Sequence, residues 1–166
     1  MARITEILGN PDGFLRTIFS HLASDQIDVS NSELDHICYR VETEARYEEL
    51  KNILETSYAT LLSEAIIWDR FISTYRLNDP IRYINRTISI LELPAPKPTK
   101  FYTEWYEHVE FVIDKSFDEF ISEHPDLEFD THSQWKMINP EISRNYQEGS
   151  VKFHHTSLEQ VIKMEQ

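Results

Sequence analysis

Two segments of the chain alternate between polar and apolar side chains with the period of two that is typical of β-strands. One covers residues 34–41 and the other residues 107–113, and each carries a histidine on its polar face. The polar faces consist of His36, Cys38 and Arg40 in the first segment, and of His108, Glu110 and Val112 in the second. The opposite faces are apolar and suited to packing under a helix. Two histidine strands in matching positions predict a duplicated unit with a polar site between its halves.

The segments that follow each histidine strand repeat one order of elements. Thr43 in the first half and Ser116 in the second are each placed to cap a helix. Further strands are expected over 60–63, 70–77 and 87–93 in the first half, and over 129–138 (weaker) and 150–155 in the second. The remaining expected features are a helix over 11–24, a turn at 78–80 and a last helix capped by Ser157. The pattern therefore predicts an α+β fold with a βαβββ order in each half and an N-terminal helix.

We expect the 166 residues to form one domain with four parts. These are an N-terminal helical segment (1–32), a first module (33–93), a connector (94–104), and a second module with a C-terminal helix (105–166). The connector begins with Pro94-Ala95-Pro96-Lys97-Pro98. Proline lacks the N–H group that a strand ladder needs, so this stretch is expected to be extended and fairly stiff.

Composition narrows the classes of partner. With 29 acidic and 16 basic residues, the formal charge of −13 disfavours nucleic acids and anionic membranes and favours cations. The single cysteine excludes an intrachain disulfide, and no stretch reaches transmembrane length. Only 3 glycines are present, and none belongs to a phosphate-binding motif. These features predict an acidic, cytoplasmic protein without a membrane span.

Each half offers a second ligand-type residue on its closing strand, Glu92 in the first and His154 in the second. If the two sheets curve toward each other, these residues converge with His36 and His108. Imidazole and carboxylate groups bind zinc, iron, manganese, nickel or cobalt, so the four residues are candidate ligands of a divalent transition metal. The alternative is that the histidines are ordinary strand residues, hydrogen-bonded to their neighbours.

Other polar residues on the same faces suggest further roles. Glu110 lies two residues beyond His108 and is a candidate catalytic base, or else a carboxylate paired with a neighbouring cation. The basic residues Arg40, Arg76 and Lys152 are candidate contacts for an anionic substrate group, with solvated surface as the alternative.

Four short segments carry a resemblance to a known family. They are Leu34-Asp35-His36-Ile37, Ile90-Leu91-Glu92-Leu93-Pro94, Trp105-Tyr106-Glu107-His108-Val109-Glu110 and Val151-Lys152-Phe153-His154. The histidine strands resemble the first strands of the βαβββ modules of the vicinal oxygen chelate superfamily, which includes glyoxalase I, extradiol dioxygenases and fosfomycin-resistance proteins. Over roughly residues 10 to 165 the chain is more closely similar to the YecM-like proteins of that superfamily.

The resemblance implies two βαβββ modules that form a cupped mixed sheet around a divalent metal, with helices outside. The ligands carried over are His36, Glu92, His108 and His154, although the superfamily usually has a glutamate at the last position. The implied function is a metal-dependent enzyme of isomerase, lyase or dioxygenase type that acts on a small oxygen-rich substrate. The alternative is a non-catalytic protein that binds a metal or small molecule in the same cup, and a homodimer is an open possibility.

Overall fold

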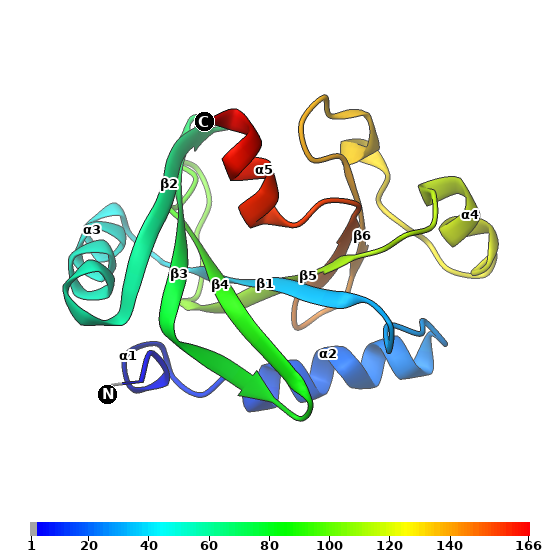
Figure 1. The fold of residues 1–166 in the computed structure, drawn as a ribbon, viewed down its shortest axis with the longest axis horizontal. Helices are drawn as coiled ribbons and strands as arrows, with labels where there is room; N and C mark the ends of the chain where they lie inside the picture. Colours follow the sequence, from blue (N-terminus) through cyan, green and yellow to red (C-terminus); the bar gives the residue numbers. More distant parts are fainter. Residues whose placement is uncertain (1–2) are drawn as a thin grey trace. The chain divides into compact units, whose positions relative to one another are not determined.

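The computed structural model describes residues 3–166, which form two compact units with an α+β fold (Figure 1). Unit 1 contains the chain up to Pro11 together with His36–Glu107, and unit 2 contains Asp12–Asp35 together with His108–Gln166. Two strands, β1 (Glu33–Arg40) and β5 (Trp105–Val112), pass from one unit to the other. Among the described residues, no helix has both the length and the apolar character needed to span a bilayer.

Unit 1 has the predicted βαβββ order. Its strands lie in the order β2-β3-β4-β1, where β1 and β4 are parallel and the other pairs are antiparallel. The elements are α1 (Thr5–Leu8), α3 (Glu44–Ile53), a π-helical turn (Leu54–Tyr58), β2 (Ala59–Ile67), β3 (Arg70–Tyr83) and β4 (Arg86–Pro94). Thr43 caps α3 as predicted, because its side chain accepts a hydrogen bond from the backbone N–H of Arg46 at 3.1 Å.

The prediction of a turn at residues 78–80 is wrong. β3 continues through Asn78-Asp79-Pro80, and only its pairing with β4 is interrupted, between Arg76 and Ile81. Pro80 has no N–H to donate to the ladder, so the proline breaks the hydrogen bonding without ending the strand.

Unit 2 contains three strands in the order β5-β7-β6, with β5 and β7 parallel and β6 antiparallel to β7. Its other elements are α2 (Asp12–Ser24), α4 (Phe117–Ser122), a 3-10 helix (His132–Trp135), β6 (Glu141–Asn145), β7 (Ser150–His154) and α5 (Leu158–Glu165). Ser116 and Ser157 cap α4 and α5 through their side chains, as predicted. The predicted helix over 11–24 corresponds to α2.

The weak strand expected over 129–138 is reduced to one bridge between Asp130 and Ser143. Trp135 and Met137 are largely exposed, so this stretch has no buried face to hold it in a sheet, and part of it forms the 3-10 helix. The edge position is taken by β6, which the pattern did not predict.

Helices cover the apolar face of the strands in each unit, as the alternation predicted. In unit 1, Tyr47 of α3 is buried and its hydroxyl lies 2.7 Å from that of Ser73 in β3. In unit 2, Phe19 of α2 packs edge-on against Phe111, and Phe120 of α4 lies 4.6 Å from Phe153. The opposite face of each set of strands is therefore the polar one.

Gly9 fixes how the N-terminal segment of unit 1 packs. Its φ of 87° and ψ of 162° fall in a region essentially restricted to glycine, and an added Cβ would lie 2.8 Å from the Trp105 ring.

Gly9→Ala is expected to lower the free energy of unfolding by about 2–4 kcal/mol, because backbone strain adds to this clash. Gly13→Ala is the matched control, since nothing lies within 4 Å of its added Cβ. That change in α2 should stabilise the protein by about 0.5–1 kcal/mol. Urea unfolding of both variants tests the prediction, and equal effects of the same sign would contradict it.

Candidate metal centre

The polar face of unit 1 brings His36 and Glu92 together. The parallel register places His36 opposite Ile90 and Cys38 opposite Glu92, so these side chains lie on one face. The Nε2 atom of His36 lies 4.0 Å from Oε2 of Glu92, and the imidazole is almost completely buried. Two ligand atoms on one zinc ion lie about 3–3.5 Å apart, given metal–ligand distances near 2.1 Å. The pair therefore fits a shared metal ion after a small closing movement.

Cys38 and Arg40, farther along the polar face of β1, both contact Glu107. The buried Cys38 thiol donates to Oε2 of Glu107 at 3.6 Å, and the Arg40 guanidinium lies 3.9 Å from Oε1. Arg40 also donates to the backbone carbonyl of Thr103 at 3.0 Å and lies over the Tyr102 ring. Part of the hydrogen-bonding capacity of Arg40 is therefore used to hold the connector.

Arg76 lies on β3, opposite Thr60 on one side and Ile90 on the other. It is exposed. The register puts it on the same face as His36, because His36 also pairs with Ile90. Its role as a substrate contact stays a prediction.

The polar face of unit 2 holds a buried cluster centred on Glu110. Oε1 of Glu110 lies 3.2 Å from Nε2 of His108 and 3.4 Å from Nζ of Lys152. Lys152 also lies 3.3 Å from Oε1 of Glu141, which in turn lies 3.3 Å from Lys136. Glu110 is thus surrounded by an imidazole and an ammonium group, both on its own face of the strands.

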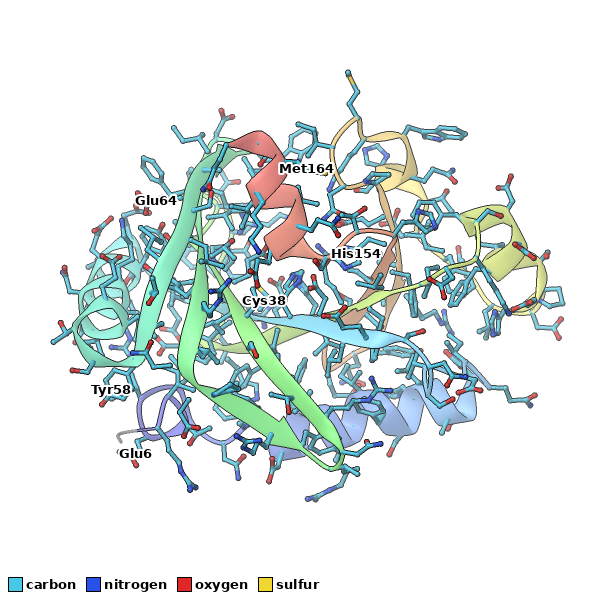
Figure 2. All side chains as sticks on the ribbon, in the orientation of Figure 1. Glu6, Cys38, Tyr58, Glu64, His154 and Met164 are labelled. Carbon is cyan, nitrogen blue, oxygen red and sulfur yellow. The ribbon has the colours of Figure 1, made fainter. Side chains whose placement is uncertain are left out.

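His154, labelled in Figure 2, is the last residue of β7 and completes this cluster. Its Nδ1 lies 3.3 Å from Oε2 of Glu110, and its Nε2 lies 3.3 Å from Oδ2 of Asp35. The same oxygen of Asp35 accepts the backbone N–H of Leu158, the first residue of α5, at 2.9 Å. His154 therefore has a carboxylate beside each of its two ring nitrogens.

Two members of the cluster were missed in the sequence. Asp35 precedes His36, and simple alternation assigns it to the helix-covered face of β1. Glu141 belongs to β6, which has a single apolar residue, Ile142, as a pattern signal. The sequence could have indicated Asp35 only as an acidic residue next to a candidate histidine ligand.

A second polar cluster, on the helix-covered face of unit 1, has a structural role. The hydroxyls of Tyr47 and Ser73 donate to Glu64 at 2.8 and 2.9 Å, and Lys51 forms an ion pair with the same carboxylate. The hydrogen bond from Lys51 is the main reason why the pKa of Glu64 lies below its usual value. This cluster ties α3 to β2 and β3 on the side away from His36.

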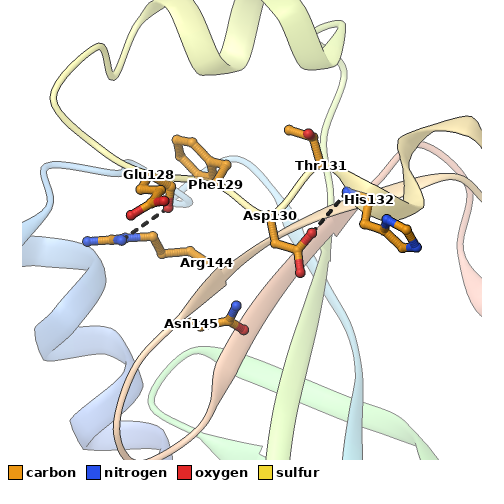
Figure 3. Close-up of a pocket in the computed structure, with 7 residues that line it drawn as sticks. All are labelled: Glu128, Phe129, Asp130, Thr131, His132, Arg144 and Asn145. Atoms are coloured by element: carbon orange, nitrogen blue, oxygen red, sulfur yellow. Dashed lines mark hydrogen bonds between the residues drawn. The ribbon is translucent and has the colours of Figure 1, made fainter.

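Unit 2 also has an open pocket of about 660 Å³ (Figure 3). It is lined by Glu128, Phe129, Asp130, Thr131, His132, Arg144 and Asn145. Its Arg144 donates to Asp25 at 2.9 Å and to the carbonyl of Glu128 at 3.1 Å, and its Asp130 accepts the N–H of His132. None of the predicted site residues lines it.

The structure thus brings together His36 with Glu92 in unit 1, and His108 with Glu110, Lys152 and His154 in unit 2. That the two sets share one metal ion stays a prediction.

Sequence comparisons identify two bacterial relatives. An uncharacterized protein of Haemophilus influenzae is 38% identical over 96 residues, which cover 56% of this chain. The match spans 49% of that protein, so the chain accounts for about half of its length. Protein YecM of Escherichia coli K12 is 27% identical over 156 residues, which cover 84% of this chain and 82% of the relative.

Two solved structures share the fold. A structural-genomics protein, EC4020, matches with a TM-score of 0.76 and 25% identity over 92% of this chain and 87% of its own. A methylmalonyl-CoA epimerase variant of Streptomyces coelicolor, in complex with 2-nitronate-propionyl-CoA, matches with a TM-score of 0.57 and 10% identity. That match covers 76% of this chain and 98% of the epimerase, and at this identity it shows only that the two proteins share a fold. The family model described as YecM protein matches residues 3–165, and the chain therefore belongs to the YecM family.

Proposed function

We propose that this protein is a divalent-metal-dependent enzyme of the vicinal oxygen chelate type that acts on a small oxygen-rich substrate. The proposal rests mainly on one arrangement that occurs in both units. In each, the opening and closing strands are parallel, and a buried imidazole on the opening strand lies beside a carboxylate, which belongs to the closing strand in unit 1 and to the opening strand in unit 2. The pairs are His36 with Glu92 at 4.0 Å and His108 with Glu110 at 3.2 Å.

In this proposal the metal is held by His36, Glu92 and His108, and His154 is the sequence-based candidate for a fourth ligand. Two imidazoles and one carboxylate suit zinc, iron, manganese, nickel or cobalt, and three protein ligands leave positions open for substrate. A bound divalent ion supplies Lewis-acid stabilisation of the negative charge that develops on substrate oxygen.

The buried carboxylate of Glu110 is the group proposed to take a proton from the substrate. It lies beside His108, and a general base must lie within hydrogen-bond reach of the proton that it removes. Lys152 lies 3.4 Å from Glu110 and offsets its charge in this buried position. Arg40, Arg76 and Lys152 remain the candidates for contact with an anionic group of the substrate.

The ligand bound by the methylmalonyl-CoA epimerase that shares this fold suggests the substrate class that we propose. The ligand of that enzyme carries a nitronate, a planar anion with two oxygens on one nitrogen. Such a group resembles the enolate that forms when a proton is removed next to a carbonyl. A small substrate with neighbouring oxygens and an acidic C–H bond is therefore the class that we propose.

Metal analysis of protein purified without chelator tests the proposal. We expect about one transition metal ion per chain, and the loss of that ion in His36→Ala and in His108→Ala, because each change removes a ligand. His132→Ala is the matched control, since His132 is exposed and belongs to a different part of unit 2. Circular dichroism verifies that all three variants fold.

Two results would contradict the proposal. One is protein that stays free of metal after incubation with zinc, cobalt and manganese. The other is binding of small molecules with undiminished affinity after both histidine changes, which would instead indicate a non-catalytic binding protein.

A further inference from the structure

The pairing registers of the two units show that β7 does not repeat the ligand position of β4. In unit 1, Glu92 lies opposite Cys38, two residues beyond His36. The corresponding place in unit 2 is opposite Glu110, two residues beyond His108, and it is occupied by Lys152. His154 lies one pleat farther along β7, opposite Val112. The structural counterpart of the ligand Glu92 is therefore an ammonium group.

The surroundings of His154 explain what this residue does instead. A histidine that binds a metal offers one ring nitrogen to the ion, and its other nitrogen usually donates to a carboxylate. In His154 both nitrogens lie 3.3 Å from carboxylate oxygens, one from Glu110 and one from Asp35. The side chain is completely buried. Both nitrogens therefore already face carboxylates, and the register places Lys152, not His154, opposite Glu110 at the position that corresponds to Glu92.

Asp35 is itself held in place by a hydrogen bond from the backbone of α5. One carboxylate oxygen of Asp35 both accepts the N–H of Leu158 and lies next to His154. The first N–H groups of a helix have no partner within the helix, so Asp35 satisfies one of these donors in α5. The position of Asp35 is thereby set by the backbone, and the His154 ring lies between this carboxylate and that of Glu110.

Both oxygens of the Glu110 carboxylate thus lie next to nitrogen atoms of neighbouring side chains. Its Oε2 faces His154, and its Oε1 faces His108 and Lys152. We infer that His154 is a positioning residue which, together with Asp35, fixes the orientation of the Glu110 carboxylate, and that it is not a metal ligand. The inference rests on the proposed function in that Glu110 is the proton-accepting group and His108 the metal ligand of unit 2.

The positioning role can be tested in metal-free protein, by the ¹³C carboxyl resonance of Glu110. The signal is assigned through its loss in Glu110→Gln. We expect His154→Ala and Asp35→Asn to shift this signal, and exogenous imidazole to restore it in His154→Ala only. His154→Gln keeps a hydrogen-bonding side chain in case the alanine variant does not fold. His155→Ala is the matched control, because His155 is exposed and contacts the carbonyl of Lys115 instead. An unchanged Glu110 signal in the folded His154 and Asp35 variants would overturn the positioning role.

The second arm is a zinc titration of the ¹⁵N-labelled full chain, with the histidine ring nitrogens as the readout. Ring nitrogens of His36 and His108 should move to metal-bound shifts, while those of His154 stay unchanged. The Kd for zinc in His154→Gln should remain within about threefold of the unchanged protein, against the tenfold or larger loss expected for a ligand or its direct partner. A metal-bound shift at His154, or a loss of that size, would overturn the inference. Zinc that moves no histidine would instead overturn the proposed function, and the metal-free arm would still decide the role of His154.

Discussion

Addition of zinc to metal-stripped protein is expected to raise Tm by about 10 °C. An ion that binds only the folded chain stabilises it by about 4 kcal/mol when its free concentration is a thousand times Kd. For a chain of this size, 1 kcal/mol corresponds to about 2–4 °C in Tm. The ligands proposed here lie far apart in the sequence, at His36, Glu92 and His108. The unfolded chain cannot hold them together, so the full binding energy favours the folded state. Differential scanning calorimetry with and without zinc measures the shift.

The acidic surface of the protein requires a control in this experiment. A formal charge of −13 attracts divalent cations without any specific site. Binding of that kind weakens in salt, whereas a buried site is screened much less. The rise in Tm should therefore persist in 0.3 M salt, should be absent with magnesium at the same concentration, and should disappear in the double variant His36→Ala/His108→Ala. An equal rise in the double variant would show that zinc stabilises the protein elsewhere.

The alternation of polar and apolar residues along each strand predicted which side chains of the candidate site share a face. The period of two placed His36 on the polar side of its strand and Glu110 on the same side as His108, and the contacts in each unit agree. The same period assigned the apolar sides to helices, as found for Phe111 under α2. These inferences need only local geometry, which each strand carries in its own sequence.

Register between strands was not predictable in the same way. The sequence suggested His154 as the counterpart of Glu92, because both are ligand-type residues near the end of a closing strand. The pairing instead puts Lys152 in that place, and a shift of two residues keeps the face while changing the partner. The register of the parallel strands β5 and β7 depends on packing across the sheet, which the sequence of a single strand does not reveal. Asp35 was missed for a related reason, since its contact with Leu158 joins residues distant in the chain.

Replacement of Phe111 by alanine is expected to lower the free energy of unfolding by about 3–5 kcal/mol, because it removes a completely buried aromatic ring and leaves a cavity. The ring lies 6.0 Å from that of Phe19 in α2 and 6.2 Å from that of Phe153 in β7. It therefore joins a covering helix to two adjacent strands of unit 2. Urea unfolding followed by circular dichroism measures the loss, which corresponds to a fall in Tm of about 10 °C or more.

The matched control is Phe101→Ala, which removes the same ring from a fully exposed position. This change should alter stability by no more than about 0.5 kcal/mol, because the side chain has no packing to lose. Phe111 points to the helix-covered face, whereas its neighbour Glu110 points to the polar one, so folded Phe111→Ala protein should keep the zinc affinity of the unchanged chain. A large loss of zinc affinity in folded Phe111→Ala protein would mean that the two faces of β5 do not have the separate roles inferred here.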